Sequence, residues 1–305
     1  MTWLLWRQHR AQMAIVAGLL AVFAIPVVVT GRHLSDGLVA CRANGPCGGL
    51  LDHYNAMLTS VNLTVAVPLI FGIFWGVSVI GRELETGTAT LAWSQSVTRR
   101  HWVRVKLLWL FGTTLVASSA LTTLVTWWSN TRNALQESRF SGLPFDLENL
   151  SPVGYSLFSA ALGLAAGVAW RRVLPAVATT IAGFVGVRMI VELVLRPHYM
   201  APVRRLVSMG AAPEGPRGGW SYDTELVHNG HVIAGNVVGV PDACARGVGR
   251  RDLNQCMDAQ GYRVRISYQP AGRYWTFQWI EFGIFAALSV LLVGAALVVL
   301  RRRDV

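Results

Sequence analysis

The chain has 305 residues, of which 53% are hydrophobic and 14% charged, and its formal net charge is +11. This balance argues against a soluble globular domain and indicates a protein that crosses a membrane several times. The positive charge does not indicate a nucleic-acid partner, because basic residues beside membrane spans are topology signals and contacts for anionic lipid headgroups.

Six apolar runs are long enough to cross a hydrocarbon core of about 30 Å, which takes roughly 20 helical residues. The expected fold class is therefore an all-α membrane protein. Residues 1–10 hold Trp3, Trp6 and two arginines, and we expect an interfacial helix there, with a simple anchor before the first span as the alternative. The expected spans lie near residues 11–30, 61–80, 107–128, 152–170, 174–195 and 278–300.

The predicted organisation has three parts. Residues 1–195 contain the N-terminal helix and five spans, residues 196–277 form a domain outside the membrane, and residues 278–305 contain the sixth span and a basic tail. The loop at 129–151 is expected to have little structure. In the fourth span, Gly163 and Gly167 form a pair that permits close helix approach, either within one chain or between two copies.

Arginine placement predicts the orientation. Basic residues concentrate in the segments that share a side with the N-terminus, and short cytoplasmic loops carry such an excess. Both termini are therefore expected on the cytoplasmic side of the membrane. The basic residues on that side are Arg7, Arg10, Arg82, Arg99, Arg100, Arg104, Lys106, Arg171, Arg172, Arg301, Arg302 and Arg303, whereas the two short outer loops hold Arg32, Arg42, Arg132 and Arg139.

The four cysteines fall on the opposite side, where disulfides persist. Three pairings are open to four cysteines, and we expect the two local ones, Cys41–Cys47 and Cys244–Cys256. The spacing does not fit a zinc site, so no metal is predicted.

The long outer segment carries strand signals. Asn229 and Gly230 separate two β-prone runs, which is typical of a two-residue hairpin turn, and a further β-prone run covers 262–268. We expect a small, strand-containing domain clamped by a disulfide. His228 and His231 flank the turn without a third ligand, and are interpreted as exposed turn residues.

Three charged residues lie near the outer ends of the last two spans, namely Arg188, Glu192 and Glu281. A charge at mid-bilayer costs about 2.5–3.5 kcal/mol, and less near the interface. Arg188 and Glu192 can pair along one helix face or with a neighbouring helix. Two interpretations stay open: an outer gate or polar path, and a structural ladder of ion pairs.

The segment 81–106, between the second and third expected spans, is polar, basic and rich in turn residues. It begins Arg82-Glu83-Leu84-Glu85-Thr86-Gly87-Thr88, continues through an aliphatic stretch at 89–93, and ends with Thr98-Arg99-Arg100 and Lys106. This order resembles the corresponding loop of type-2 ABC exporter permeases. The opening residues 1–10 and the segment 268–281 look like an actinobacterial branch of that family.

The resemblance implies a homodimer that binds two cytoplasmic ABC ATPase subunits through a coupling helix in this loop. It implies that ATP and Mg²⁺ are bound by the ATPase, and the chain itself has no phosphate-binding loop or other enzyme motif. Glu83 and Glu85 are expected to pair internally or with a basic ATPase surface. The expected coupling residues are Arg82, Glu83, Glu85, Gly87, Thr88, Leu91 and Trp93.

The function expected from these observations is export of a hydrophobic or amphipathic compound by alternating access, driven by the separate ATPase. The alternative is a membrane sensor or resistance-associated scaffold that does not transport and whose outer domain binds a ligand.

Overall fold

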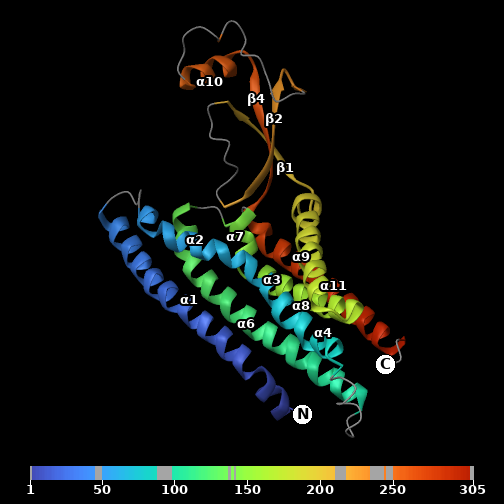
Figure 1. The fold of residues 1–305 in the computed structure, drawn as a ribbon. Coiled ribbons are helices and arrows are strands. Elements are labelled where there is room, and N and C mark those ends of the chain that lie inside the picture. Colours follow the sequence, from blue (N-terminus) through green and yellow to red (C-terminus); the bar gives the residue numbers. More distant parts are fainter. Residues whose placement is uncertain are drawn as a thin grey trace.

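The computed structural model describes residues 2–44, 50–87, 98–136, 139–140, 142–209, 218–233, 244 and 250–302. It is mostly helical, and the helices form an elongated bundle with a small sheet beyond one end (Figure 1). Both chain termini lie at the other end of the bundle. Six helical segments are long and apolar enough to cross a membrane, as predicted: Leu20–Ala43, Ala56–Glu85, Arg100–Ala134, Ser151–Trp170, Val173–His198 and Ala271–Arg302.

The first span belongs to one long helix, α1 (Thr2–Asn44), which continues without a break from the expected interfacial segment into the span. Within the described residues, its segment Leu20–Ala43 is long and apolar enough to cross a membrane, and this segment overlaps the expected span 11–30. It packs along α6 (Arg99–Gln136), where Val27 and Leu34 meet Val125 and Trp128.

The second span is assembled from short pieces. After η1 (Leu50–Tyr54) come α2 (Asn55–Leu63), η2 (Thr64–Ala66), α3 (Val67–Phe71), the π-helical η3 (Gly72–Val77) and α4 (Ser78–Glu85). A π-helical turn is wider than an α-helical turn and usually occurs as a single local irregularity.

Glycines let this span lie directly on the backbone of α8 (Ser151–Trp170). A Cβ atom added to Gly76 would lie 2.6 Å from the Ala160 carbonyl oxygen, and one added to Gly163 would lie 3.0 Å from the Val77 nitrogen. The small residues Gly163 and Gly167 therefore serve packing within the chain, which was one of the two alternatives.

The central helix α8 is the most buried of the spans. Its Tyr155 and Phe158 pack against Phe184 of α9 (Val173–Ile190) and Phe285 of α11 (Tyr274–Arg302). After α9 the fifth span continues through η4 (Val191–Leu195) and η5 (Arg196–His198).

The loop between the third and fourth spans was expected to have little structure, and that expectation is wrong. Helix α6 continues to Gln136, and a short helix, α7 (Gly142–Leu147), follows with Phe145 and Asp146 buried. The apolar residues of α7 pack against the ends of the spans that lie nearest the sheet, because Phe145 joins Phe140, Tyr274 and Phe277 in an aromatic cluster.

The segment after the fifth span forms a four-stranded antiparallel sheet of order β1-β4-β2-β3. Its strands are β1 (Val203–Ser208), β2 (Trp220–His228), β3 (His231–Val232) and β4 (Tyr262–Gln269), with α10 (Arg250–Ala259) before β4 and η6 (Ala271–Arg273) after it. The predicted hairpin is confirmed, because Asn229 and Gly230 have φ angles of 48° and 85° and join β2 to β3.

The predicted Cys244–Cys256 disulfide is present. The other expected pair includes Cys47, which lies outside the described residues, so that pairing stays a prediction. His228 stacks on Tyr262 with ring centroids 4.2 Å apart, and His231 is exposed.

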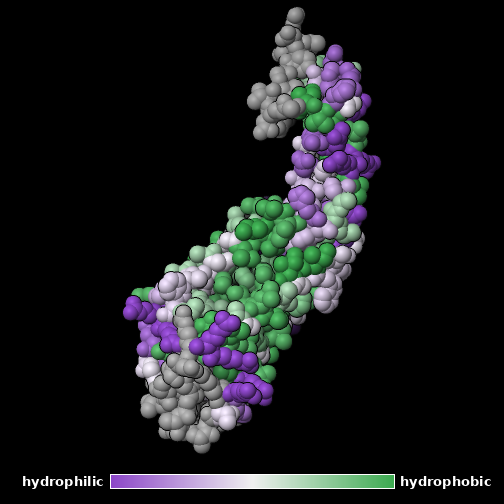
Figure 2. Space-filling view, turned by 90° about the vertical axis from the view of Figure 1, so that its right-hand side faces the viewer, coloured by the Kyte–Doolittle hydropathy of each residue, from purple (hydrophilic) through white to green (hydrophobic). Residues whose placement is uncertain are grey.

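A broad hydrophobic band covers the face that Figure 2 shows, between hydrophilic residues of the sheet and hydrophilic residues at the opposite end of the bundle. Exposed aliphatic side chains such as Leu174 and Leu193 of the fifth span and Val290 and Leu291 of α11 contribute to this apolar surface. Such a belt is what a lipid bilayer requires of a helical bundle.

Candidate functional site

Two clusters of charged side chains lie at opposite ends of the bundle. The first is at the end that holds both termini, where α4 and α6 approach the predicted coupling loop. Gly87 has a φ of +70°, a conformation that favours glycine, so the chain turns sharply after α4 as expected. Thr88, Leu91 and Trp93, which were predicted to couple, lie outside the described residues.

Glu83 and Lys106 form a buried ion pair between α4 and α6, with 2.6 Å between the Lys106 Nζ and the Glu83 Oε1. The ammonium also donates a hydrogen bond to the Val79 carbonyl oxygen at 2.7 Å and lies 4.4 Å from the centroid of the Trp102 ring. Lys106 and Trp102 are buried. The negative charge of Glu83 is therefore paired with Lys106 within the chain.

Glu85 reaches a different span. Its Oε2 accepts a hydrogen bond of 3.2 Å from the backbone N–H of Val173, the first residue of α9. The first N–H groups of a helix have no partner within the helix, and an acceptor there satisfies one of them. Arg82 is exposed. Both Glu83 and Glu85 make contacts within the chain, and pairing with a basic ATPase surface stays a prediction.

The second group lies at the sheet end of the bundle and consists of Asp146, Tyr155, Arg188, Arg196 and Glu281. It is here called the outer-end charge cluster, after the orientation predicted from the sequence. Arg188 pairs with Asp146 at 2.6 Å, and Arg196 pairs with Asp146 at 2.5 Å and with Glu281 at 2.6 Å. The single O–H of Tyr155 lies within hydrogen-bonding distance of both Asp146 and Glu281 and can donate to either carboxylate. Five elements, namely α7, α8, α9, η5 and α11, contribute one residue each.

The cluster is buried and its charges balance. Asp146, Arg196 and Glu281 are each no more than 3% exposed, and Arg188 lies 4.2 Å over the Tyr155 ring. Two acids face two arginines, so each charge has a partner. Charges taken out of water are stable only when paired and hydrogen-bonded in this way.

The sequence pointed to only part of this cluster. Arg188 and Glu281 belong to it, but the partner of Arg188 is Asp146 of α7, and Glu192 makes no ion pair among the described residues. Asp146 was missed because it lies in the segment that was expected to lack structure. Its position inside the run Gly-Leu-Pro-Phe-Asp-Leu, where an acid is flanked by apolar residues, was the available signal.

A neighbouring cluster of buried polar side chains lies at the same end of the bundle. Glu148 is fully buried and accepts hydrogen bonds from Arg132 at 2.8 Å and from Asn133 at 3.0 Å. Burial raises the pKa of the Glu148 carboxyl, while the hydrogen bond from Asn133 and the charge of Arg132 oppose that rise. Nearby, the Gln278 Oε1 accepts the backbone N–H of Ser151 at 2.8 Å and so caps the start of α8.

The sheet packs directly against this end of the bundle. Trp220 of β2 packs against Phe140 and Phe277, with ring centroids 6.1 Å and 6.5 Å apart. Tyr199, in the connection to β1, donates a 3.3 Å hydrogen bond to Glu281. The connection into the sheet therefore touches the outer-end charge cluster directly.

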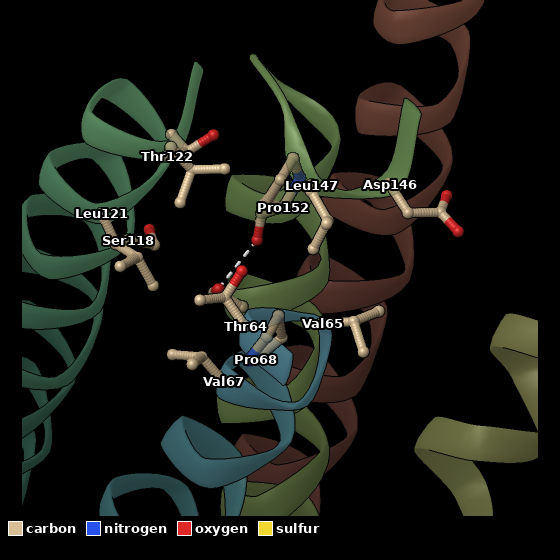
Figure 3. Close-up of a pocket in the computed structure, with 12 residues that line it drawn as sticks. Thr64, Val65, Val67, Pro68, Ser118, Leu121, Thr122, Asp146, Leu147 and Pro152 are labelled. Atoms are coloured by element: carbon tan, nitrogen blue, oxygen red, sulfur yellow. Dashed lines mark hydrogen bonds between the residues drawn. The ribbon is translucent and has the colours of Figure 1, made fainter. Parts of the chain in front are cut away.

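A small pocket opens beside this cluster, between the second, third and fourth spans (Figure 3). Thr64, Ser118 and Thr122 place hydroxyl groups in its wall, and Pro68 and Leu121 add apolar surface. The carboxylate of Asp146 points away from the other labelled residues, so the pocket itself is lined by hydroxyl and apolar groups.

A six-span helical bundle with an apolar belt and polar clusters at both ends defines a multi-pass membrane protein. The chain matches the family described as ABC-2 membrane transporter related over residues 13–196, which is more than half of its length, and it belongs to that family. This membership makes it an ABC-2 permease-type membrane component and implies association with an ABC ATPase. The family match ends before the sheet, and no curated protein and no solved structure matches the chain.

Proposed function

We propose that the chain is the permease subunit of an ATP-driven exporter. Two copies would assemble with two ABC ATPase subunits in a bacterial plasma membrane and move a hydrophobic or amphipathic compound outward by alternating access. ATP and Mg²⁺ would bind to the ATPase, and this chain would receive motion without performing hydrolysis. An actinobacterial source rests on the segments 1–10 and 268–281 alone.

The observation that carries the proposal is the set of contacts at the two stems of the α4–α6 loop, residues 86–98. Its first stem is joined to the third span through Glu83 and Lys106, and to the fifth span through Glu85 and Val173. A partner that pushes on this loop therefore moves three spans together.

The proposed orientation puts this loop and both termini in the cytoplasm. Exposed arginines gather at that end of the bundle, which is the pattern that cytoplasmic segments have and which also suits anionic lipid headgroups. The disulfide of the sheet lies at the opposite end, on the proposed outer side, where disulfides persist. The exposed arginines are Arg82, Arg100, Arg104, Arg172, Arg301 and Arg302.

In this mechanism the outer-end charge cluster holds the exit closed. Arg188, Arg196 and Glu281 tie the outer ends of the fifth and sixth spans to α7, and Glu192 lies half-buried beside them. Separating these groups leaves buried charges unpaired, which costs about 3–5 kcal/mol for a broken pair. Closure of the ATPase subunits would supply that energy through the loop.

The cargo class follows from the interior. The described charged groups of the spans lie near the two ends of the bundle, and the surface between those ends is apolar. An apolar compound with a few hydrogen-bonding atoms fits such a surface better than an ion does.

The test is reconstitution of the chain with its ABC ATPase in vesicles. We expect the two proteins to purify together, and an amphipathic fluorescent dye to stimulate ATP hydrolysis and to be moved across the bilayer. A folded chain that purifies without the ATPase, and that binds the dye through its sheet domain with no effect on hydrolysis, would instead support the sensor.

A further inference from the structure

Lys106 is chemically singular in this chain, because it is the one lysine among 27 basic residues. Its side chain is 3% exposed and its ammonium meets three partners: the Glu83 carboxylate at 2.6 Å, the Val79 carbonyl oxygen at 2.7 Å and the Trp102 ring at 4.4 Å. An ammonium is compact and can point its donors in three directions, whereas the larger planar guanidinium of arginine directs its donors in one plane.

The partners come from the two stems of the α4–α6 loop. Val79 and Glu83 lie one turn apart on α4, and Trp102 and Lys106 lie one turn apart on α6. A single ammonium group therefore joins the last two turns of one helix to the first two turns of the other.

The contact of Lys106 with Glu83, Val79 and Trp102 is here called the joint, and its burial makes it stiff. Trp102 is 4% exposed and the Glu83 side chain 16% exposed, so the ion pair lies where water screens it poorly. Gly81 adds a direct backbone contact, because a Cβ atom there would lie 3.1 Å from the Cα of Gly167 in the fourth span. The stem of α4 is thus held on two sides, and sliding it along α6 would break charge-assisted hydrogen bonds.

We propose that Lys106 is a positioning residue that makes the two stems of the α4–α6 loop one rigid arm, so that a push on the loop moves the second and third spans as a unit. This inference rests on the proposed function for what pushes the arm. The joint itself is a property of the chain alone.

The first test uses the amine. In the folded chain, a small amine-reactive probe should modify Lys106 at least about tenfold more slowly than in the denatured chain, because reaction needs local opening of the joint. Peptide mass spectrometry separates Lys106 from the N-terminal amine. The variant Arg104→Lys places a second lysine at an exposed position on the same helix and serves as an internal reference. Equal reaction rates at the two lysines in the folded variant would overturn the proposal.

The second test measures transport per ATP in the reconstituted complex, with the amphipathic dye that the wild-type complex moves. Lys106→Met should still bind the ATPase and permit hydrolysis, while dye moved per ATP falls about 5- to 10-fold, the lower end of typical couplings between sites. Lys106→Arg should show a similar loss of dye moved per ATP. The matched control, Arg104→Met, removes a nearby exposed charge and should keep the wild-type ratio.

A double variant separates positioning from stability. Glu83→Met together with Lys106→Met replaces the buried pair by apolar groups, which generally preserves folding. We expect its thermal stability to return to that of wild type while dye moved per ATP stays low. If the double variant recovers both thermal stability and dye moved per ATP, the joint only stabilises the fold. A wild-type value of dye moved per ATP in Lys106→Met would show the same.

The proposed function and this inference fail in different ways. If the chain never binds the ATPase, the proposed function is wrong, yet slow amine modification would still establish the joint. If the complex exports dye and Lys106→Met exports it equally well per ATP, only the inference is wrong.

Discussion

At the scale of single residues, the molecule places its buried charges in pairs that cross between elements. Glu281 is 1% exposed and is bound by Arg196, Tyr155 and Tyr199. Burial, and next the charge of Glu281, raise the pKa of the Tyr199 hydroxyl, which therefore stays protonated and donates. Glu192 is half-buried and outside any ion pair of the described residues, so two acids flagged by the same sequence argument have different surroundings.

This difference gives a first prediction. Glu281→Gln should destabilise the chain by about 3–5 kcal/mol, because Arg196 then keeps one buried partner where it had two. Glu192→Gln should change stability by less than about 0.5 kcal/mol. Thermal unfolding of the two purified variants, followed by loss of monodisperse protein, checks this. Equal melting temperatures of the two variants would mean that the buried ion pair of Glu281 contributes no more to stability than the half-buried Glu192 does.

The same two variants test the proposed gate. Once Glu281→Gln is shown to be folded, the account expects altered dye export, because one tie between η5 and α11 is weakened. Normal export by both folded variants would remove the gate and leave an ion-pair cluster with a purely structural role.

At the scale of elements, the contact between the second span and α8 depends on glycines, which have no side chain to keep the two backbones apart. Gly76→Ala would drive a methyl group into the Ala160 carbonyl, 2.6 Å away, and should cost about 1–3 kcal/mol. The control is Gly112→Ala in α6, where no atom lies within 4 Å of the added Cβ and alanine favours the helix by about 0.5–1 kcal/mol. Thermal unfolding should thus shift in opposite directions, and equal shifts would contradict the close packing.

The disulfide of the sheet domain gives an element-scale prediction of its own. Cys244 and Cys256 are 12 residues apart in the chain, and the bond ties Cys256 of α10 to Cys244, which precedes that helix. Cys256→Ser should lower the stability of this domain by about 2–4 kcal/mol. Limited proteolysis should therefore cut residues 233–262 faster in the variant, while the spans remain intact. A wild-type digestion pattern would show that the sheet does not need the bond.

For the molecule as a whole, the sequence predicted what local patterns control. The six spans follow from apolar runs, and the hairpin follows from the left-handed conformations that Asn229 and Gly230 tolerate. The partners of the buried charges could not be predicted, because Asp146 and Arg188 are distant in sequence and meet only once α7 has folded back onto the spans. The segmented second span was missed for a related reason, since its π-helical turn fits contacts with α8 that no local pattern reveals.

The orientation of the whole molecule is open to a direct check. A cysteine placed by Asn229→Cys lies at the exposed hairpin turn, and one placed by Thr98→Cys lies at the exposed start of α6. In intact cells, a thiol reagent that cannot cross membranes should label the first and not the second, and permeabilised cells should show labelling of both. The reverse pattern would place the termini outside and exclude ATPase docking on the α4–α6 loop.

The central claim is that an ABC ATPase docks on the α4–α6 loop. It is tested by a photo-crosslinking residue introduced at position 98, with position 229 as the control, in cells that also produce the ATPase. The account predicts a covalent adduct between chain and ATPase from position 98, and none from position 229. A folded, membrane-inserted chain that gives no adduct at position 98, while the ATPase is recovered from the same membranes bound elsewhere, would contradict it.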